Sequence, residues 1–168
     1  MHTVNRGGKI LVAILVLLLM QFDCPALAAN SDADIDIILS SAESLFKSMK
    51  DREYARIWQQ LSIKSRAEIV ESVFKATGRN NGKYSSEAID RDFTEGAELS
   101  KSYWNSYLDN FDPDTVLKQS KWEIGAVSDG YAEIRVTFRK AAAPAVLKMF
   151  KQDGRWKVGL IETFGAKK

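Results

Sequence analysis

Cysteine and histidine are almost absent from this chain of 168 residues, since each occurs once, as Cys24 and His2. Both lie within residues 1–28, a segment with the form of a leader that is removed. The remaining chain can form no internal disulfide, no Cys-His or Ser-His pair and no zinc or copper site of the usual kind. Chemistry would have to rest on carboxylates, amines or hydroxyls. We therefore expect a protein that is not an enzyme and has no metal and no cofactor.

The leader prediction rests on features that follow one another in the order expected of a secretory signal. A cationic start and the apolar run ILVAILVLLLM precede the small residues of Ala26-Leu27-Ala28. The run is shorter than the about 20 residues that cross a bilayer. We predict a signal peptide over residues 1–28 and export to the periplasm or the exterior. Lipidation at Cys24 and a retained anchor stay open, although Asp23 stands where lipoprotein signals carry a small residue.

Charge is divided unevenly along a chain whose formal net charge is +2. Residues 29–117 hold 11 basic and 16 acidic side chains, a net charge of −5. Residues 118–168 hold 11 basic and 5 acidic side chains, a net charge of +6. The two parts can pack on each other or each be solvated, and a basic face could instead meet anionic headgroups. Peripheral membrane contact thus stays open, and for an exported protein we expect no nucleic-acid partner.

Helical periodicity covers residues 32–118. Apolar residues recur at steps of three and four from Ile35 to Met49, and a shorter pattern predicts a second helix over residues 53–61. Ser65-Arg66-Ala67-Glu68 has the form of a capping box, which predicts a helix that starts there and stops at Gly78.

One longer helix is predicted from Ser86 to Asn110, with a kink at Gly96. Asp112-Pro113 then predicts a helix start of only a turn or two, because aspartate caps and proline misses no donor in a first turn.

The acidic residues at the start of the first helix have a spacing that also occurs in calcium-binding loops. Asp32, Asp34, Asp36 and Glu43 have the spacing of EF-hand ligands. Position six of that loop needs glycine for its sharp turn, but here it is Ile37. The same residues fit the helical pattern, so a helix with an acidic first turn is the prediction.

Residues 121–164 change to a period of two, which is typical of strands. Asp129-Gly130 and Asp153-Gly154 lie between alternating runs, the strongest short-range signal for a hairpin. We predict an antiparallel meander of four strands. The inward residues of its first strand would be Trp122, Ile124 and Ala126. The predicted fold is therefore α+β, with N-terminal helices packed on a curved, mostly antiparallel four-stranded sheet in one domain over residues 29–168.

Three stretches of the chain resemble the nuclear transport factor 2-like superfamily, also called the cystatin-like α+β roll. They are residues 44–69, the strand YAEIRVTF, and LKMFKQDGRWKVGLIETF near the C-terminus. The resemblance implies a cone-like pocket between helices and sheet, and many small secreted members have no known function. Enzyme members hold acid-base residues in that pocket. No such constellation can be placed here, and the helical stretch from Ser65 to Asn110 departs from them.

A second, weaker resemblance is to periplasmic phospholipid carriers of the toluene-tolerance type, which also combine a signal peptide, helices and a meander. It implies an apolar cavity for acyl chains.

Six residues are predicted to line the cleft between helices and sheet, on the basis of their phase: Trp104, Tyr107, Trp122, Phe138, Trp156 and Glu162. Glu162 is of particular interest because a buried carboxylate can act as an acid or base. The alternative is a structural role, in which Glu162 lies at the rim of the cleft and pairs with a lysine or arginine. The predicted function is an exported binding domain for a small apolar or amphipathic ligand or an envelope protein partner. A lipid carrier and a carboxylate-based dehydratase or isomerase remain alternatives, and a homodimer paired through a sheet edge stays open.

Overall fold

The computed structural model describes residues 32–78, 84–139 and 143–165, so the predicted leader lies outside the described residues. The described part forms seven helices: α1 (Asp32–Lys50), α2 (Tyr54–Gln60), α3 (Ile63–Gly78), α4 (Ser86–Glu95), α5 (Glu98–Leu108), α6 (Pro113–Gln119) and α7 (Leu160–Phe164). It also forms four strands: β1 (Ser120–Ser128), β2 (Tyr131–Phe138), β3 (Ala145–Gln152) and β4 (Arg155–Gly159).

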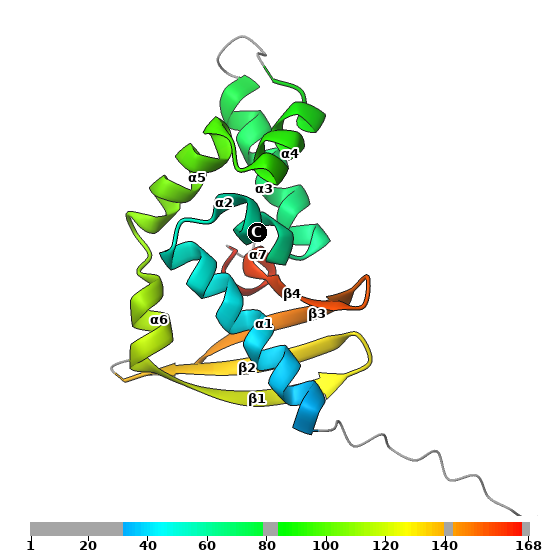
Figure 1. The fold of residues 1–168 in the computed structure, drawn as a ribbon, viewed down its shortest axis with the longest axis vertical. Coiled ribbons are helices and arrows are strands. Elements are labelled where there is room, and N and C mark those ends of the chain that lie inside the picture. Colours follow the sequence, from blue (N-terminus) through cyan, green and yellow to red (C-terminus); the bar gives the residue numbers. More distant parts are fainter. Residues whose placement is uncertain (1–31, 79–83, 140–142, 166–168) are drawn as a thin grey trace, which may run out of the picture.

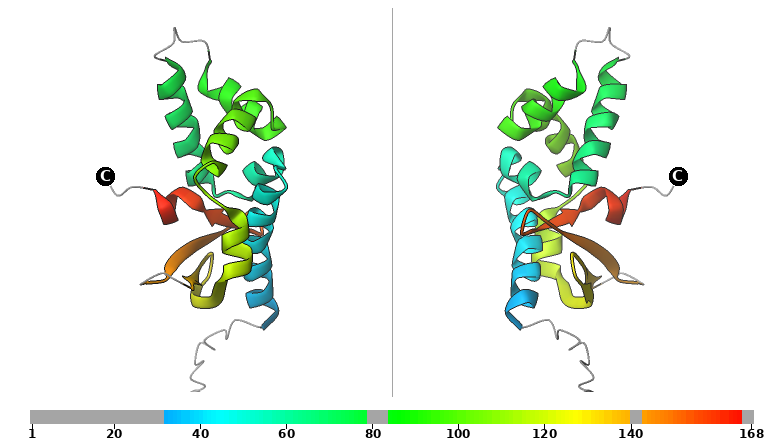
Figure 2. Two further views of the ribbon diagram at one scale, coloured as in Figure 1. Left: turned by 90° about the vertical axis from the view of Figure 1, so that its left-hand side faces the viewer. Right: turned by 90° about the vertical axis from the view of Figure 1, so that its right-hand side faces the viewer.

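The elements are arranged in two regions (Figure 1). The base consists of the four-stranded sheet, with α1 lying across one face and α6 beside it. The head consists of α2 to α5, which stand above the β4 side of the sheet. Helix α1 contacts α2, α6 and β4, and therefore joins the two regions. Figure 2 shows α7 on the opposite side of the molecule from α1.

Helix α1 follows from its sequence pattern. Acidic side chains lie in its first turn and basic ones in its last, which the helix dipole favours. One stripe of α1 is buried: Ile38, Ala42, Leu45, Phe46 and Met49. The residues that resemble a calcium loop, Asp32, Asp34, Asp36 and Glu43, all lie within this helix.

The sheet is an antiparallel meander in the order β1-β2-β3-β4. Both predicted hairpin turns are confirmed, and Gly130 and Gly154 adopt φ angles of 81° and 71°. Inward side chains of the two central strands are fully buried: Ala132, Ile134, Leu147 and Met149. The α+β prediction, helices packed on a four-stranded antiparallel sheet, is confirmed.

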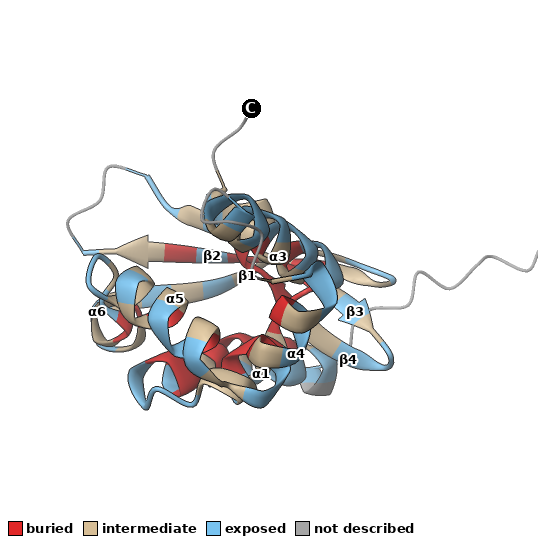
Figure 3. Cartoon of the chain, turned by 90° about the horizontal axis from the view of Figure 1, so that it is seen from above, coloured by how far each residue is buried: buried red, intermediate tan, exposed pale blue. Residues whose placement is uncertain are grey.

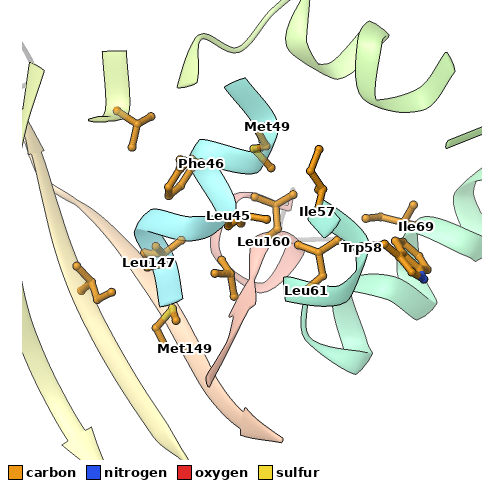
Figure 4. Close-up of a cluster of buried hydrophobic side chains, with 14 of the residues drawn as sticks. Leu45, Phe46, Met49, Ile57, Trp58, Leu61, Ile69, Leu147, Met149 and Leu160 are labelled. Carbon is orange, nitrogen blue, oxygen red and sulfur yellow. The ribbon is translucent and has the colours of Figure 1, made fainter. Parts of the chain in front are cut away.

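Buried side chains fill the space where α1 meets the sheet. Figure 4 shows Leu45 and Phe46 of α1 close to Leu147 and Met149 of β3, with Leu160 beside them. Burial of each side chain of this size stabilises the fold by about 1.5–3 kcal/mol. Figure 3 shows the buried residues gathered on the facing sides of the helices and strands. The contact between α1 and the sheet is therefore the centre of the core.

A bulge in β1 changes the predicted phase of this strand. The pairing of β1 with β2 shifts between Ile124 and Val127. Val127 packs against the core, whereas Ala126 is exposed. The prediction that Ala126 points inward is wrong, because an extra residue in a bulge exchanges the two faces of the strand beyond it.

Gly96 divides the predicted long helix into α4 and α5. It adopts a left-handed φ of 68°, and the N–H of Ala97 donates to the carbonyl of Asp92 over 2.9 Å. The Asp92 side chain then accepts from the N–H of Ser100 over 2.8 Å, which supports the first turn of α5. The prediction of one helix from Ser86 to Asn110 is wrong, since the glycine ends the first helix instead of kinking it.

Ser62, and not Ser65, caps α3. The hydroxyl of Ser62 accepts from the N–H of Ser65 over 3.0 Å, and the helix begins at Ile63. The side chain of Glu68 pairs loosely with Lys64 at 3.9 Å. The predicted capping box is wrong because α3 already begins at Ile63, and the Ser65 hydroxyl accepts from the N–H of Ile161 instead of from an N–H of α3.

Strand β4 ends at Gly159, and the chain continues as α7. The ring of Phe150 lies across Gly159, where an added Cβ atom would be 2.5 Å from that ring. The prediction that the last strand continues to residue 164, with Glu162 in its inward phase, is wrong. Glu162 instead belongs to a helix that packs on β3 and α3.

The outer edge of β4 is covered by the segment before α3. Leu61 forms a parallel bridge with Val158, and the N–H of Ser62 donates to the carbonyl of Val158 over 2.9 Å. The opposite edge strand, β1, carries the bulge and charged side chains such as Lys121 and Glu123. These devices hinder pairing with another sheet.

Candidate functional site

The six residues predicted to line a cleft do not converge on one hollow. Three of them belong to a single chain of aromatic ring contacts: Trp104, Tyr107 and Trp122. The other three lie outside that chain: Phe138, Trp156 and Glu162. The position of each is given below.

Eight aromatic rings form a continuous chain from the head to the base, with neighbouring centroids 4.7–6.0 Å apart. In order they are Trp58, Phe93, Tyr103, Trp104, Tyr107, Phe111, Phe46 and Trp122. Burial raises the pKa of Tyr107 to about 12, so its hydroxyl stays protonated. Trp104 is fully buried. The four buried rings pack the head and the base together: Trp58, Phe93, Trp104 and Phe46. The other four rings stay partly accessible, and Tyr103 and Tyr107 line a hollow separate from that beside Trp122.

Trp122 is held at the junction of β1, α1 and α6. Its indole N–H donates to the hydroxyl of Ser120 over 2.8 Å, and its ring meets the ring of Phe46 edge to face at 5.7 Å. The polar atom of the indole is thus satisfied. Part of the ring remains accessible beside the two helices.

A cleft of about 400 Å³ opens beside Trp122, between α1, α6 and β1. Its lining is Asp36, Leu39, Ser40, Glu43, Leu117 and Trp122. The volume lies within the range of about 300–1,000 Å³ that is usual for small-molecule sites. The half-buried Leu39, Leu117 and Trp122 supply apolar surface, and the exposed Asp36 and the half-buried Glu43 supply negative charge. We call this hollow the Trp122 cleft.

A three-way ion pair fixes α6 against α1. The carboxylate of Asp114 accepts from Lys50 of α1 at 3.0 Å and from Lys118 at 3.2 Å. The hydrogen bond from Lys50 lowers the pKa of Asp114, and the same bond raises the pKa of Lys50. The two helices also form two walls of the Trp122 cleft, although none of these three charged residues lines it.

Glu162 is bound by two serine hydroxyls. Ser62 Oγ donates to one carboxylate oxygen over 2.6 Å, and Ser65 Oγ donates to the other. The same hydroxyls accept from the N–H groups of Ser65 and Ile161, each over 3.0 Å. Both serines are fully buried. Since every group has a partner, the arrangement ties α7 to the start of α3 and indicates a structural role for Glu162.

Phe138 and Trp156 lie at the margins of the sheet. Phe138 ends β2, opposite Ser120, and packs partly buried against the core. Trp156 pairs with Lys151 across the last hairpin, and the Lys151 ammonium lies 6.0 Å from the ring centroid. Neither of the two lines the Trp122 cleft.

Basic side chains outnumber acidic ones on the face of the sheet turned away from α1. Arg135, Lys148 and Arg155 lie on it, and Glu123 and Glu133 lie opposite Arg135 and Lys148 in the strand register. The pKa of Lys157 is lowered, first by burial and then by the nearby cations Arg66 and Arg155. The positive charge of the second half of the sequence is therefore partly gathered on this face, and contact with a membrane surface stays a prediction.

Within the described ranges, no three His, Cys, Asp or Glu side chains are grouped so that they could hold a metal ion. In those same ranges, no helix is both long and apolar enough to cross a membrane.

Comparison with known proteins found no family model, no curated protein and no solved structure that matches the chain. The resemblances noted from the sequence therefore stay predictions.

Sequence reasoning found one residue of the Trp122 cleft and missed the rest. Trp122 stood out through its inward phase in β1. Leu39 and Leu117 are apolar residues beside the main helical stripes, and no local pattern marks them. Asp36 and Glu43 share the spacing of calcium ligands, which does not predict a cleft. Their better signal is that they lie seven residues apart, which places them on one side of a helix.

Proposed function

We propose that this protein is an exported binding domain without catalytic activity, and that it binds a small amphipathic molecule with a positively charged group in the Trp122 cleft. The observation that carries the proposal is the combination of an apolar floor and an acidic rim in this cleft. The predicted signal peptide over residues 1–28 supports export.

The two parts of the cleft suit the two parts of such a ligand. An alkyl or ring portion would cover Leu39, Leu117 and the accessible part of Trp122, with a gain of about 25 cal/mol per Å² of apolar surface buried. A cationic group would lie near Asp36 and Glu43, and an indole face also attracts cations. Glu43 already pairs with Lys47 at 3.0 Å, but the pair is exposed and weak.

Other features favour binding over catalysis and over lipid transport. Both oxygens of Glu162, the carboxylate with the strongest sequence signal, are bonded to serines. The contact between α1 and β3 is filled by Phe46, Leu147 and their neighbours, which favours a shallow site over an enclosed acyl-chain cavity.

Three probes with one tail and different head groups test the proposal: octyltrimethylammonium, octyl sulfate and octyl glucoside, each below its micelle concentration. Binding would be followed by calorimetry and by NMR shifts of backbone amides. We expect the cation to bind most tightly and to shift amides around Leu39, Leu117 and Trp122. Equal affinity for the three heads, or shifts elsewhere, would refute the proposal.

A pair of matched variants then tests the acidic rim. Asp36→Asn with Glu43→Gln should weaken binding of the cationic probe by about fivefold, since each exposed charge contributes little. Glu98→Gln with Asp109→Asn removes the same number of charges from α5 and its C-cap and should leave binding unchanged. An equal loss in both double variants would indicate attraction to net charge alone.

A further inference from the structure

Helix α3 presents an apolar stripe to solvent in the head. Ile63 and Phe74 are 55% and 42% exposed, and Ala67 and Val70 lie between them on the same side of the helix. All four line a groove of about 920 Å³ between α3 and α4. The α4 wall of this groove is polar: Ser86, Glu87, Asp90, Arg91 and Thr94. A contiguous apolar stripe on the exposed side of a helix is typical of a surface that contacts another protein.

The spacing of the stripe indicates the kind of partner. Ile63, Ala67, Val70 and Phe74 follow one another at steps of four, three and four, which is the seam of a coiled coil. The groove residues that α3 contributes besides these four are Arg66 and Glu71. They flank the seam on opposite sides and are five residues apart, as the charged flanking positions of successive heptads are.

We propose that a second copy of this chain occupies the groove, with the two α3 helices parallel about a two-fold axis. In that arrangement each Arg66 faces Glu71 of the partner subunit across the seam, so the contact forms twice. An antiparallel pair would instead bring the same flank of both helices together, arginine beside arginine. The charges of Arg66 and Glu71 therefore favour a second copy of this chain as the partner, and they favour the parallel orientation of the two helices.

The state of the two charged residues is compatible with this contact. Within the described residues Arg66 makes no ion pair, and its buried Nε has no hydrogen-bond partner. Glu71 pairs with Lys75 of its own helix, and both side chains are more than half exposed. A carboxylate can accept from two cations, so the dimer does not require that pair to break.

This inference goes beyond the proposed function, because the α3–α4 groove and the Trp122 cleft share no residue. The proposed dimer can therefore be refuted while the proposed ligand site stands, and the reverse also holds.

Sedimentation velocity of the purified protein over a wide concentration range tests the dimer, with Ile63→Glu and Ile37→Glu as matched variants. Both isoleucines are about equally exposed, at 55% and 54%, but Ile37 lies on α1. We expect the unmodified protein and Ile37→Glu to dimerise, and Ile63→Glu to raise the dissociation constant at least tenfold. The inference would be overturned if the protein were monomeric at every concentration, or if Ile63→Glu left the dissociation constant of the dimer unchanged.

Charge reversal tests the orientation without placing a charge in the seam. Arg66→Glu alone and Glu71→Arg alone should each weaken the dimer about tenfold, because two attractive pairs become repulsive. The double variant should restore wild-type association, since it only exchanges the two signs. Far-UV circular dichroism of each variant confirms that the helices are intact. Failure of the double variant to recover would overturn the parallel pairing.

Discussion

The base and the head are held together in different ways. In the base, one helix of 19 residues lies across a sheet, and continuous apolar stripes from both are buried together. In the head, four helices of 7 to 16 residues are joined by tight connections, and one of them leaves a stripe exposed. The structure of the base depends on the repeat of apolar residues along a helix and strands. The structure of the head depends on individual capping residues and on positions where two helices come close together. The two regions should therefore respond differently to substitution.

The largest effects are expected from removal of matched core isoleucines, Ile134 in the base and Ile89 in the head. Both are fully buried, so an alanine at either position should lower the free energy of unfolding by about 2–5 kcal/mol. Because α1 and the Leu61–Val158 bridge join the regions, we expect one transition in calorimetry for each variant. A separate early transition in Ile89→Ala would show that the head unfolds on its own.

Two glycines with left-handed φ give the next largest contrast. An alanine at Gly96 or at Gly130 should cost about 1–2 kcal/mol from backbone strain alone. At Gly96 an added Cβ would also lie 2.8 Å from the backbone nitrogen of Ala55, whereas nothing lies within 4 Å at Gly130. Urea titrations should therefore show the greater loss for Gly96→Ala. Equal losses would mean that α2 moves away from α4 at little cost.

Glu162→Gln tests the tie between α7 and α3. The amide can no longer accept from both serines as a carboxylate does, so we expect a loss of about 1–3 kcal/mol in chemical denaturation. Glu68→Gln, on the exposed side of α3, is the control and should change stability little. If the free energy of unfolding falls by the same amount in both variants, the serine contacts of Glu162 do not contribute to stability beyond an exposed glutamate.

The smallest effect is a pH dependence of the base. The folded state lowers the pKa of Asp114, so this group contributes stability above the ordinary aspartate value of about 3.9, and the contribution is lost as the pH falls through the folded value. The hydrogen bond to Asp114 raises the pKa of Lys50, so the contribution of this group is complete below the pKa of a free lysine and is lost as the pH rises through the raised pKa of the folded state. Asp114→Asn should thus have a lower melting temperature than wild type between pH 5 and 9, a gap that closes in acid. Asp109→Asn is the control, and a constant gap would contradict the linkage.

The base could be predicted in most respects because its signals are local and repeat. The stripe of α1 and the two Asp-Gly turns are visible within short windows, and the burial of Ile134 and Met149 follows from alternation. The bulge at Val127 could not be predicted, because it depends on how β1 pairs with β2 and not on the sequence of β1 alone.

The head was predicted less well because distant contacts decide its boundaries. Gly96 ends a helix where α4 approaches Ala55, and that approach is not visible in the sequence around Gly96. The hydroxyl of Ser65 accepts from the N–H of Ile161, from the other end of the chain, whereas the hydroxyl of Ser62 accepts from an N–H of α3 and caps it. The Trp122 cleft has the same property, since its walls come from segments about 80 residues apart.

The chain of rings from Trp58 to Trp122 has an optical consequence. Tyr103 and Tyr107 each contact Trp104, with ring centroids 5.0 and 5.6 Å apart. Phenol emission overlaps indole absorption, so light absorbed by either tyrosine is emitted from Trp104. Because Trp104 is fully buried, that emission is shielded from quenchers dissolved in water.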